Sequence, residues 1–274
     1  MKAVLEEYKA QLPLTVRQIF YVLVGRFNYA KTDNAYEALG EMLNLARRGG
    51  ALPFGLIRDD GDNLAAPPLW DDDEEWLKAI TREASRFRLS PWPDQPKYVE
   101  VVCEAGGMVP MLSRIADPYG VTVRSGGGFN SVTGKHDLAR FLSQQEKPVV
   151  VLHVGDHDPS GVALWLNLKE DVGAFCEYFG AEFQARRVAV TPEQQQFYGL
   201  ETDKAKPQDE RNRKSIWVAG TPTVQAEALP PDVLQQLVED AIRDEMDLEA
   251  LEGTKERQEE IREDLTSRLE LLLG

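Results

Sequence analysis

The sequence has only two cysteines, Cys103 and Cys176, and both lie within apolar segments. Their spacing matches no paired metal-ligand motif, so buried, reduced thiols are favoured over a zinc site or a disulfide. Long hydrophobic runs are absent too, since no stretch approaches the roughly 20 apolar residues of a membrane span. The first residues, MKAVLEEYKAQL, lack the apolar stretch of a secretory signal. We therefore expect a cytoplasmic protein with no membrane contact.

Positive charge is scarce overall, because 31 Lys and Arg stand against 46 Asp and Glu, a net charge of -15. DNA binding depends on neutralised phosphates, so this balance argues against a polyanionic partner. The excess of acid is local, however. Residues 1–58 carry eight bases and five acids, residues 59–75 carry eight acids and no base, and residues 227–274 carry fifteen acids and five bases. The N-terminal region is mildly basic and therefore compatible with DNA contact.

Hydrophobic periodicity predicts two helices near the N-terminus. Apolar residues recur at helical spacing from Thr15 to Phe27, with Thr15 as the N-cap. A second helix is predicted from about Asn34 to Arg48, where Arg47 and Arg48 precede two glycines. The following ALPFGLI is typical of a short strand. Helix, turn, helix and strand together favour a winged-helix (helix-turn-helix) unit, although many helical hairpins share this pattern.

The rest of the chain predicts an α/β fold. Residues 59–96 combine the acidic run with five prolines and one predicted helix near 74–88, so they form a connector. Beyond it the strands YVEVVC, VTVR, VVVLHV and RRVAV alternate with helices at about 108–115, 136–143 and 162–175, which predicts a parallel sheet covered on both faces. After irregular residues 191–226, a charged helical extension is expected to break near Gly253. We thus expect domains at 1–95 and 96–274.

Three acidic residues follow predicted strands of this sheet. Glu104 comes directly after the first strand, and Asp156 and Asp158 lie in the loop GDHDPSG after the third. Ligands bind beyond the carboxyl ends of parallel strands, where the three carboxylates are expected to face one another. Clustered carboxylates repel unless a cation neutralises them, and hard oxygen ligands suit Mg²⁺ or Mn²⁺. The alternative is an Asp-rich turn that caps the next helix.

A second candidate group lies on the first predicted helix. Arg17 and Tyr21 are four residues apart and share a face that lies off the apolar stripe. A guanidinium beside a phenol favours the phenolate and can bind the phosphate under attack. An ordinary surface contact would produce the same spacing. Lys31, Arg47 and Arg48 are candidate contacts to a DNA backbone, which would set register without reading sequence.

These motifs resemble a known family. EAGG after one strand and GDHDPSG after another are similar to the Toprim domain of topoisomerases, primases and certain nucleases, and the RSGGGFNS loop fits it as well. The form DxDPxG and the segment TVRQIFYVLV resemble the A subunit of topoisomerase VI and the related meiotic double-strand-break protein, with Tyr21 in the place of the catalytic tyrosine. Phe20 departs from the commoner double tyrosine. The resemblance covers about residues 13–58 and 97–175.

The resemblance implies a winged-helix domain followed by a Toprim Rossmann-like domain, of the small stand-alone phage or bacterial type. Tyr21 would attack DNA to give a 5′-phosphotyrosyl link and a free 3′-hydroxyl, with Arg17 on the phosphate and a metal ion at the acids. In this family the tyrosine of one protomer meets the metal site of another, which implies a homodimer. Whether a separate ATPase subunit takes part stays open. Glu227 is a candidate accessory ligand, although Gln225 departs from the acid-rich family segment.

Other functions stay open on the sequence. In a hydrolytic Toprim nuclease, metal-activated water replaces the tyrosine as nucleophile. In a non-catalytic DNA-binding or assembly module, the acids are vestigial and the acidic tail docks a basic partner. A sugar-nucleotide transferase or a phosphatase also uses paired aspartates, but Ser160 stands where the phosphatase signature has threonine. Neither of these last two explains the first 58 residues.

Overall fold

The computed structural model describes residues 2–58, 67–126, 131–204 and 222–273. Contacts divide the chain into two units, each made of two separate stretches. Unit 1 comprises residues 1–61 and 97–245, and unit 2 comprises residues 62–96 and 246–274. The boundary expected near residue 95 lies where the first stretch of unit 2 ends. Within the described ranges, no helix is long and apolar enough to cross a membrane.

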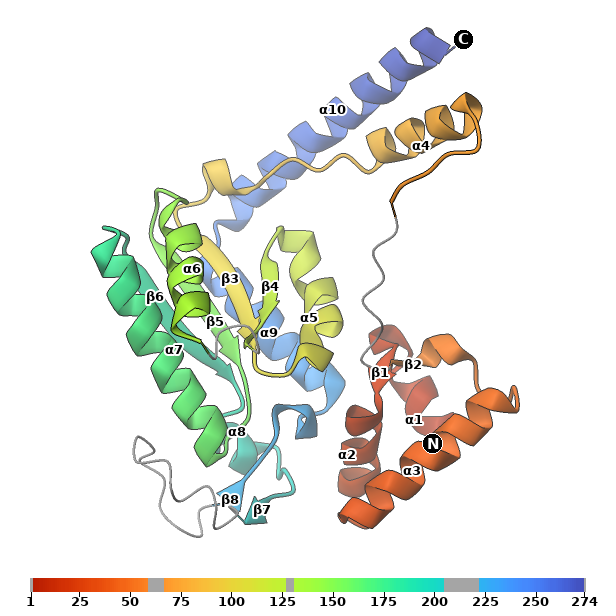
Figure 1. The fold of residues 1–274 in the computed structure, drawn as a ribbon, viewed down its shortest axis with the longest axis vertical. Helices are drawn as coiled ribbons and strands as arrows, with labels where there is room; N and C mark the ends of the chain where they lie inside the picture. Colours follow the sequence, from red (N-terminus) through yellow and green to blue (C-terminus); the bar gives the residue numbers. More distant parts are fainter. Residues whose placement is uncertain (1, 59–66, 127–130, 205–221, 274) are drawn as a thin grey trace. The chain divides into compact units, whose positions relative to one another are not determined.

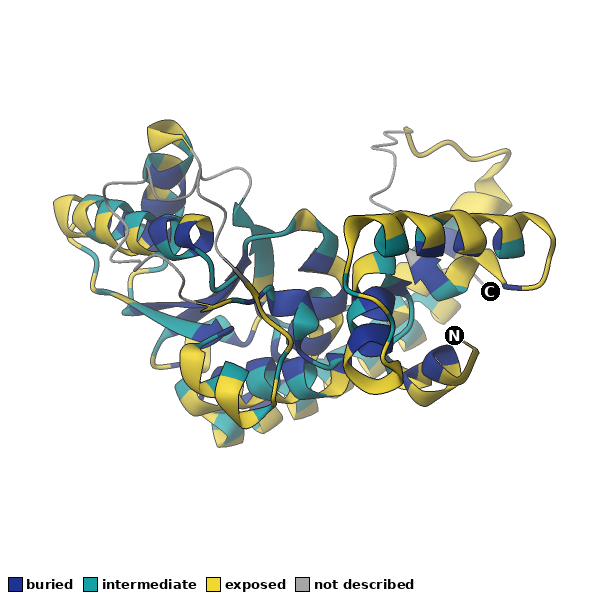
Figure 2. Ribbon diagram, turned by 90° about the horizontal axis from the view of Figure 1, so that it is seen from below, coloured by how far each residue is buried: buried dark blue, intermediate teal, exposed yellow. Residues whose placement is uncertain are grey.

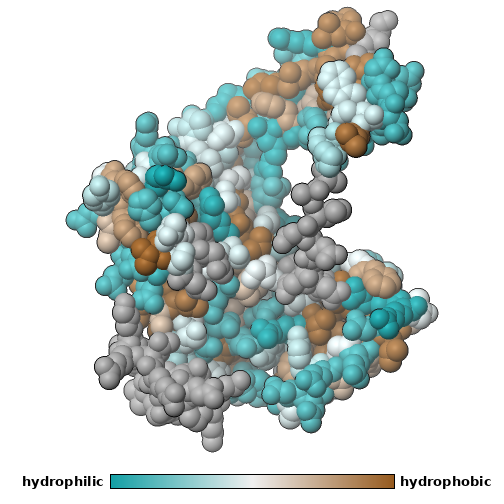
Figure 3. Space-filling model, viewed as in Figure 1, coloured by the Kyte–Doolittle hydropathy of each residue, from teal (hydrophilic) through white to brown (hydrophobic). Residues whose placement is uncertain are grey.

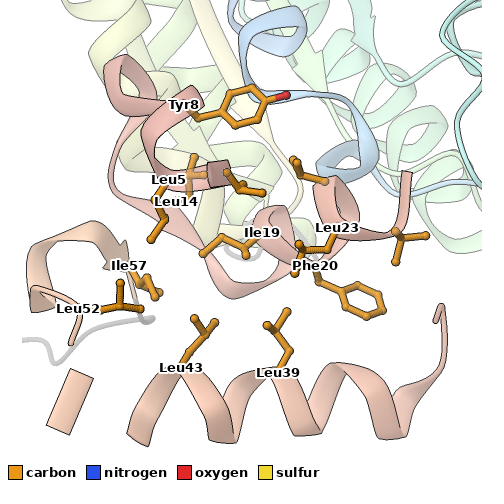
Figure 4. Close-up of a cluster of buried hydrophobic side chains, with 13 residues drawn as sticks. Leu5, Tyr8, Leu14, Ile19, Phe20, Leu23, Leu39, Leu43, Leu52 and Ile57 are labelled. Carbon is orange, nitrogen blue, oxygen red and sulfur yellow. The ribbon is translucent and has the colours of Figure 1, made fainter. Parts of the chain in front are cut away.

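The N-terminal part of unit 1 is mainly helical. Its elements are α1 (Lys2–Glu7), the 3-10 turn η1 (Lys9–Gln11), β1 (Leu14–Thr15), α2 (Val16–Phe27), α3 (Asp33–Arg48) and β2 (Ile57–Arg58), and the two short strands pair in parallel. Figure 4 shows the core between them, to which α2 contributes Ile19, Phe20 and Leu23 and α3 contributes Leu39 and Leu43. Both helices predicted from apolar periodicity are therefore confirmed.

The strand predicted over ALPFGLI is wrong for most of its length. Phe54–Leu56 forms a 3-10 turn, η2, and only Ile57 and Arg58 join a strand. Pro53 has no N–H to donate to a sheet, and Gly55 weakens extended pairing. The apolar residues serve packing instead, since Leu52 and Ile57 are buried in the N-terminal core. A minimal two-stranded sheet thus accompanies α2 and α3.

The centre of unit 1 is the predicted α/β sheet. Its strands are β3 (Tyr98–Cys103), β4 (Thr122–Ser125), β5 (Val149–Val154) and β6 (Phe183–Ala189), which run parallel in the order β4-β3-β5-β6. Every residue of β3 and β5 is buried, as their continuous apolar sequences require in a sheet covered on both faces. The carboxyl ends of these two neighbouring strands therefore present their next residues at one edge.

Helices cover both faces of the sheet, as Figure 1 and Figure 2 show. α6 (Val132–Ser143) packs with α7 (Pro159–Tyr178), and α5 (Val109–Ala116) packs with α9 (Pro231–Glu245). The short turns η4 (Gly106–Met108) and η5 (Asp117–Tyr119) flank α5. α6 starts four residues before the predicted position, because Ser131 caps it by accepting a hydrogen bond from the Gly134 N–H at 3.1 Å.

Residues 191–226, expected to be irregular, contain several short elements. α8 (Pro192–Phe197) follows β6, and β7 (Asp203–Lys204) pairs antiparallel with β8 (Pro222–Thr223) ahead of the 3-10 turn η8 (Ala226–Ala228). His157, in the loop after β5, exchanges two backbone hydrogen bonds of 2.8 and 3.0 Å with Val224. The chain between β8 and η8 is thereby fixed to the carboxyl edge of the sheet.

Unit 2 is built on a pair of helices, α4 (Asp73–Ser85) and α10 (Leu248–Leu273), with the turn η3 (Trp92–Asp94) against α10. Gln95 and Asp247 exchange hydrogen bonds of 2.8 and 2.9 Å that join its two stretches. Apolar side chains, among them Trp70, Trp76 and Leu269, line a groove of about 530 Å³. Figure 3 shows apolar side chains gathered over α4 and α10.

The predicted helix break near Gly253 is wrong. α9 ends at Glu245, and α10 continues through Gly253 to Leu273. The N-terminus of α10 is set by Asp247, whose carboxylate accepts a hydrogen bond from the Ala250 N–H at 3.0 Å. A glycine inside a helix costs only about 1 kcal/mol relative to alanine. The packing of α10 against α4 outweighs this cost.

Candidate active site

Helix α2 fixes the candidate nucleophile. Its N-terminus carries a capping box, in which Thr15 Oγ1 accepts a hydrogen bond from the Gln18 N–H (3.1 Å) and Gln18 Oε1 accepts one from the Thr15 N–H (2.9 Å). The apolar face of α2 is buried in the N-terminal core. Arg17 and Tyr21, one turn apart, therefore project from a helix whose start and orientation are both fixed.

The phenol of Tyr21 is half-buried and hydrogen-bonded. Its hydroxyl donates to Gln225 Oε1 at 2.8 Å, and Lys31 Nζ lies 5.5 Å from the centre of its ring. Burial raises the pKa of the Tyr21 hydroxyl, the negative charge of Asp203 raises it further, and the Arg17 guanidinium lowers it. The phenol is therefore protonated at neutral pH, and Arg17 is the neighbour that favours its ionisation.

A three-residue segment at η8, residues 225–227, holds this helix in place, and we call it the linking segment. Besides the Gln225 contact, Glu227 Oε1 accepts a hydrogen bond from Thr15 Oγ1 at 3.0 Å. The other carboxylate oxygen of Glu227 lies 3.7 Å from Arg17 Nη1. Glu227 is almost fully buried, whereas the Arg17 side chain is 45% exposed. Solvent therefore reaches the arginine side chain, whereas the carboxylate is largely shielded from it.

The structure brings Glu104 and Asp156 together at the carboxyl edge of the sheet. Glu104 follows β3 and Asp156 follows β5, its neighbour, and Glu104 Oε2 accepts a hydrogen bond from the Asp156 N–H at 3.0 Å. The Asp156 carboxylate in turn accepts one from the Ala226 N–H of the linking segment at 2.8 Å. Asp156 thus stands between Glu104 and the segment that contacts Tyr21.

Asp158, the third predicted ligand, is a helix cap. Its Oδ1 accepts a hydrogen bond from the Gly161 N–H at 2.6 Å, and Pro159 occupies the first position of α7. The contact expected of an Asp-rich turn that caps the next helix is therefore present at this residue, through one oxygen of its carboxylate. Its charge nevertheless acts on the two other acids, since it raises the pKa of both Glu104 and Asp156.

The site holds more negative charge than its surroundings stabilise. Burial raises the pKa of the Glu104 carboxyl to about 7, and the charges of Asp156 and Asp158 contribute to the rise. Burial also raises the pKa of Asp156, while the hydrogen bond from the Ala226 N–H and the charge of Arg17 lower it. A bound cation would relieve this repulsion.

The chemistry of these donors fits a hard divalent cation, because all three are carboxylates. Their arrangement is not that of a preformed ligand set. In the part of the chain that the structure describes, no group of three or more His, Cys, Asp or Glu side chains is arranged so that it could hold a metal ion. Each of the three carboxylates instead has an oxygen on a backbone N–H. Mg²⁺ or Mn²⁺ would therefore compete with these hydrogen bonds.

Two glycines of the GDHDPSG loop give the Glu104 carboxylate its space. A Cβ atom at Gly155 would lie 2.9 Å from Glu104 Oε2 and 2.5 Å from His153 Cε1. A Cβ atom at Gly161 would lie 2.9 Å from the same oxygen and 2.3 Å from the carbonyl oxygen of Asp156. Contacts under 3.0 Å force a neighbour to move. The loop therefore closes around Glu104 because both positions lack a side chain.

Arg187 in β6 is a residue of the site that sequence reasoning missed. Its guanidinium donates to the carbonyl oxygens of Gly155 (3.0 Å) and Asp156, and its Nε donates to the Val190 carbonyl at 3.2 Å. Its positive charge lowers the pKa of both Glu104 and Asp156. Its Nη1 is buried and has no hydrogen-bond partner in the described residues. A basic residue within the predicted strand RRVAV was the signal that could have found it.

Neither histidine at this edge is placed as a strong base. His153, on β5 beside Arg187, is buried with its ring 5.0 Å from the Trp165 ring centre. Burial, and then the charge of Arg187, lower the pKa of His153 to about 3, so it is neutral. Burial also lowers the pKa of His157, whose backbone fastens the loop to Val224.

The predicted DNA-contacting cations lie in three different environments. Lys31 Nζ is 3.1 Å from Asp203 Oδ2. Arg47, expected at the surface, is buried with its guanidinium 4.7 Å from the centre of the Phe54 ring. A planar guanidinium and its methylene stem can cover an aromatic face in this way. Arg48 is exposed at the end of α3 and remains accessible to a ligand.

No family model and no curated protein sequence matches this chain. Three parts of the chain on which sequence-based predictions fall lie outside the described residues: positions 127–130 of the RSGGGFNS loop, positions 59–66 of the acidic run, and positions 205–221 of the stretch expected to be irregular. A function can therefore be inferred only from the contacts of the site and from the resemblance of its motifs.

Proposed function

We propose that this protein is a metal-dependent DNA-cleaving enzyme in which Tyr21 is the nucleophile, similar to the A subunit of topoisomerase VI. The observation that carries the proposal is the linking segment. Gln225 Oε1 accepts a hydrogen bond from the Tyr21 hydroxyl, and the adjacent Ala226 N–H donates one to the Asp156 carboxylate. Two adjacent residues thereby connect a tyrosine and an acidic cluster that lie far apart in the sequence.

The proposal includes an assignment of the two parts of unit 1. Residues 1–58 would be a winged-helix domain, which is supported by α2, α3 and the short β1–β2 sheet. Residues 97–245 would be a Toprim domain, and α10, which belongs to unit 2, would be part of its helical extension. The parallel sheet with acids after β3 and β5 supports this second assignment.

Cleavage would proceed by transesterification. The phenolic oxygen of Tyr21 attacks the phosphorus of a DNA phosphodiester, so that a new bond joins that oxygen to phosphorus and the bond to the 3′-oxygen breaks. The phenolic proton leaves to solvent, and the 3′-oxygen takes a proton to become a hydroxyl. The products are a 5′-phosphotyrosyl link and a free 3′-hydroxyl. Because one phosphodiester replaces another, the reverse reaction reseals the strand.

The surrounding residues would divide the remaining work. Arg17 binds the phosphate and favours the phenolate, because it is the cation that lowers the pKa of the Tyr21 hydroxyl. Gln225 orients that hydroxyl through its 2.8 Å hydrogen bond. Glu104, Asp156 and Asp158 would hold Mg²⁺ or Mn²⁺, which when bound supplies positive charge for the leaving 3′-oxygen.

Cleavage of both DNA strands needs two tyrosines, so the proposal includes a homodimer. In the family that the sequence resembles, the tyrosine of one protomer serves the metal site of the other. Here the linking segment joins Tyr21 to the acids of its own chain, and this contact favours a site completed within one protomer. A separate ATPase subunit would serve strand passage, which is not needed for cleavage itself.

A hydrolytic Toprim nuclease is the second candidate, and one observation favours it. Burial and nearby acids raise the pKa of the Tyr21 hydroxyl, so the phenolate is scarce at neutral pH. Water activated by a metal ion at the acids would avoid that difficulty. In this case Tyr21 would serve only as a hydrogen-bond donor to Gln225.

The two candidates differ in what stays attached to DNA. We would incubate the protein with supercoiled DNA or end-labelled linear DNA and Mg²⁺ or Mn²⁺, denature it, and test for protein joined to 5′ ends. Tyr21→Phe removes the nucleophile, and Asp156→Asn removes a ligand charge while keeping an oxygen for the Ala226 N–H. Tyr178→Phe, at a position 80% exposed on α7, is the matched control.

Protein attached to 5′ ends by wild type and Tyr178→Phe, and lost in Tyr21→Phe and Asp156→Asn, is the result that the transesterase predicts. Cleavage without attached protein that survives Tyr21→Phe and needs Asp156 would identify the hydrolytic nuclease instead. DNA binding without any metal-dependent cleavage would contradict both enzymes and leave the non-catalytic binding module.

A further inference from the structure

Both cations beside Tyr21 are paired with carboxylates from a later stretch of the chain. Arg17 Nη1 lies 3.7 Å from Glu227 Oε2, and Lys31 Nζ lies 3.1 Å from Asp203 Oδ2. Asp203 belongs to β7, and Glu227 belongs to the linking segment that follows its partner strand β8. An acid on β7 and an acid shortly after β8 thus reach the two bases that flank the candidate nucleophile.

Tyr21 itself is contacted by the same stretch. Its hydroxyl donates to Oε1 of Gln225, which lies between Asp203 and Glu227 in the sequence. Lys31 lies over its ring. The negative charges of Asp203 and Glu227 both oppose ionisation of the phenol. In this arrangement the acids disfavour the very charge state that attack on a phosphate requires.

Carboxylates and phosphates are competing ligands for these cations. Both are oxyanions, and guanidinium and ammonium groups bind either one through charge-assisted hydrogen bonds. A phosphate placed for attack by Tyr21 must lie close to Arg17 and Lys31, because those bases flank the phenol. Glu227 and Asp203 now hold those two bases.

We propose that Asp203 and Glu227 form an acidic cover, which occupies the phosphate-binding positions around Tyr21 and is displaced by DNA. This inference rests on the proposed function, since it takes DNA as the ligand. It adds a competition within the chain between two carboxylates and the DNA backbone for the same two cations.

The cover is weak enough to be displaced. The side chains of Asp203 and Arg17 are 59% and 45% exposed, so solvent screens one member of each pair. A DNA strand brings several phosphates at once, whereas the cover offers one carboxylate to each cation. At Glu227, which is almost fully buried and hydrogen-bonded to Thr15, displacement means that the exposed Arg17 side chain leaves the carboxylate for the phosphate.

The test measures DNA binding without cleavage. Asp203→Asn/Glu227→Gln removes both cover charges with little change of shape. Glu170→Gln/Glu177→Gln changes the net charge equally on exposed positions of α7 and is the matched control. Binding of each protein to a fluorescein-labelled DNA duplex is followed by fluorescence anisotropy in EDTA over a series of salt concentrations.

The cover variant should bind roughly 3- to 20-fold more tightly than wild type and the control, because two partly exposed ion pairs no longer compete with DNA. The slope of log affinity against log salt should steepen by about one to two units. In wild type, each cation that binds DNA releases a counterion from DNA, but the carboxylate that it leaves takes up a cation from solution. In the variant no carboxylate is left to do so. A merely structural function of the two acids would weaken binding and leave the slope unchanged.

The outcomes separate the two proposals. If wild type binds DNA and the cover variant binds no more tightly than the control, the cover is refuted and the proposed function stands. If no protein binds DNA even at the lowest salt, DNA is not the ligand, and the proposed function and the cover are refuted together. Asp203→Asn alone guards against misfolding, because this side chain is exposed, and it should show about half of the logarithmic gain.

Discussion

Gly161→Ala tests the packing of the loop around Glu104. A Cβ atom at this position would lie 2.3 Å from the Asp156 carbonyl oxygen and 2.9 Å from Glu104 Oε2. To reach 3.0 Å, the carbonyl must move by 0.7 Å (3.0 - 2.3). That oxygen also accepts a hydrogen bond from Arg187, so its movement disturbs a second contact. We expect the substitution to destabilise unit 1 although alanine is the better helix former.

The magnitude follows from two opposing terms. An overpacked site costs about 1–3 kcal/mol, and a clash with backbone belongs at the upper end of that range. The change from glycine to alanine inside α7 returns about 1 kcal/mol through helix propensity. The net loss is about 2 kcal/mol, which lowers the midpoint of thermal unfolding by roughly 4–8 °C for a unit of this size.

Differential scanning calorimetry measures this loss against a matched control. Gly40→Ala makes the same change inside α3, where an added Cβ meets nothing within 4 Å. Only the propensity acts there, so Gly40→Ala should stabilise the protein by about 1 kcal/mol. A midpoint for Gly161→Ala at or above that of wild type would refute the close packing of the loop on Glu104.

Three further predictions concern the same region. The pKa of Glu104 rises from 4.5 to about 7 on folding, so the free energy of unfolding should fall as pH rises through that window. Glu104→Gln should flatten the fall of the thermal midpoint with pH. Midpoint curves of the two proteins that run parallel would contradict the shift. Mg²⁺ added at about pH 8 should raise the midpoint of wild type more than that of Asp156→Asn, and equal responses would argue against a cation there. Thr15→Ala should lose about 1 kcal/mol of capping energy and also the hydrogen bond to Glu227. Its loss of unfolding free energy in urea should therefore exceed that of Thr32→Ala, which removes only the cap of α3. Equal losses would mean that the bond to Glu227 contributes nothing.

The sequence predicted those parts of the site that follow from local pattern. Glu104 and Asp156 could be brought together in advance, because parallel apolar strands must end at one edge and the register of β3 and β5 is set by burial. Arg17 and Tyr21 could be placed on one face, because helical spacing is fixed. The cap that Asp158 forms was foreseen only as an alternative, because the local pattern does not decide between a capping turn and a metal ligand.

The contacts that join these parts are long-range and leave no local pattern. Gln225 and Tyr21 are separated by 204 positions, and the polar stretch around Gln225 has no periodicity that predicts its location. In the sequence, Arg187 is one residue of a predicted strand. Only the register between β5 and β6 shows that it lies beside His153. The pairing of α4 with α10 was not predicted for the same reason, because a partly apolar face on each helix does not identify its partner.

The link between Asp156 and the tyrosine helix passes through a backbone N–H, that of Ala226, and this has a consequence for mutational scanning. An alanine scan passes over the position, and nearly every side-chain replacement leaves the donor intact. Ala226 is completely buried, so larger residues fail for lack of space rather than for loss of the bond. Proline alone removes the donor, but its ring is also larger than the alanine methyl, so its effect would combine loss of the bond with lack of space. The most informative position in the linking segment is therefore one whose side chain has no chemistry of its own.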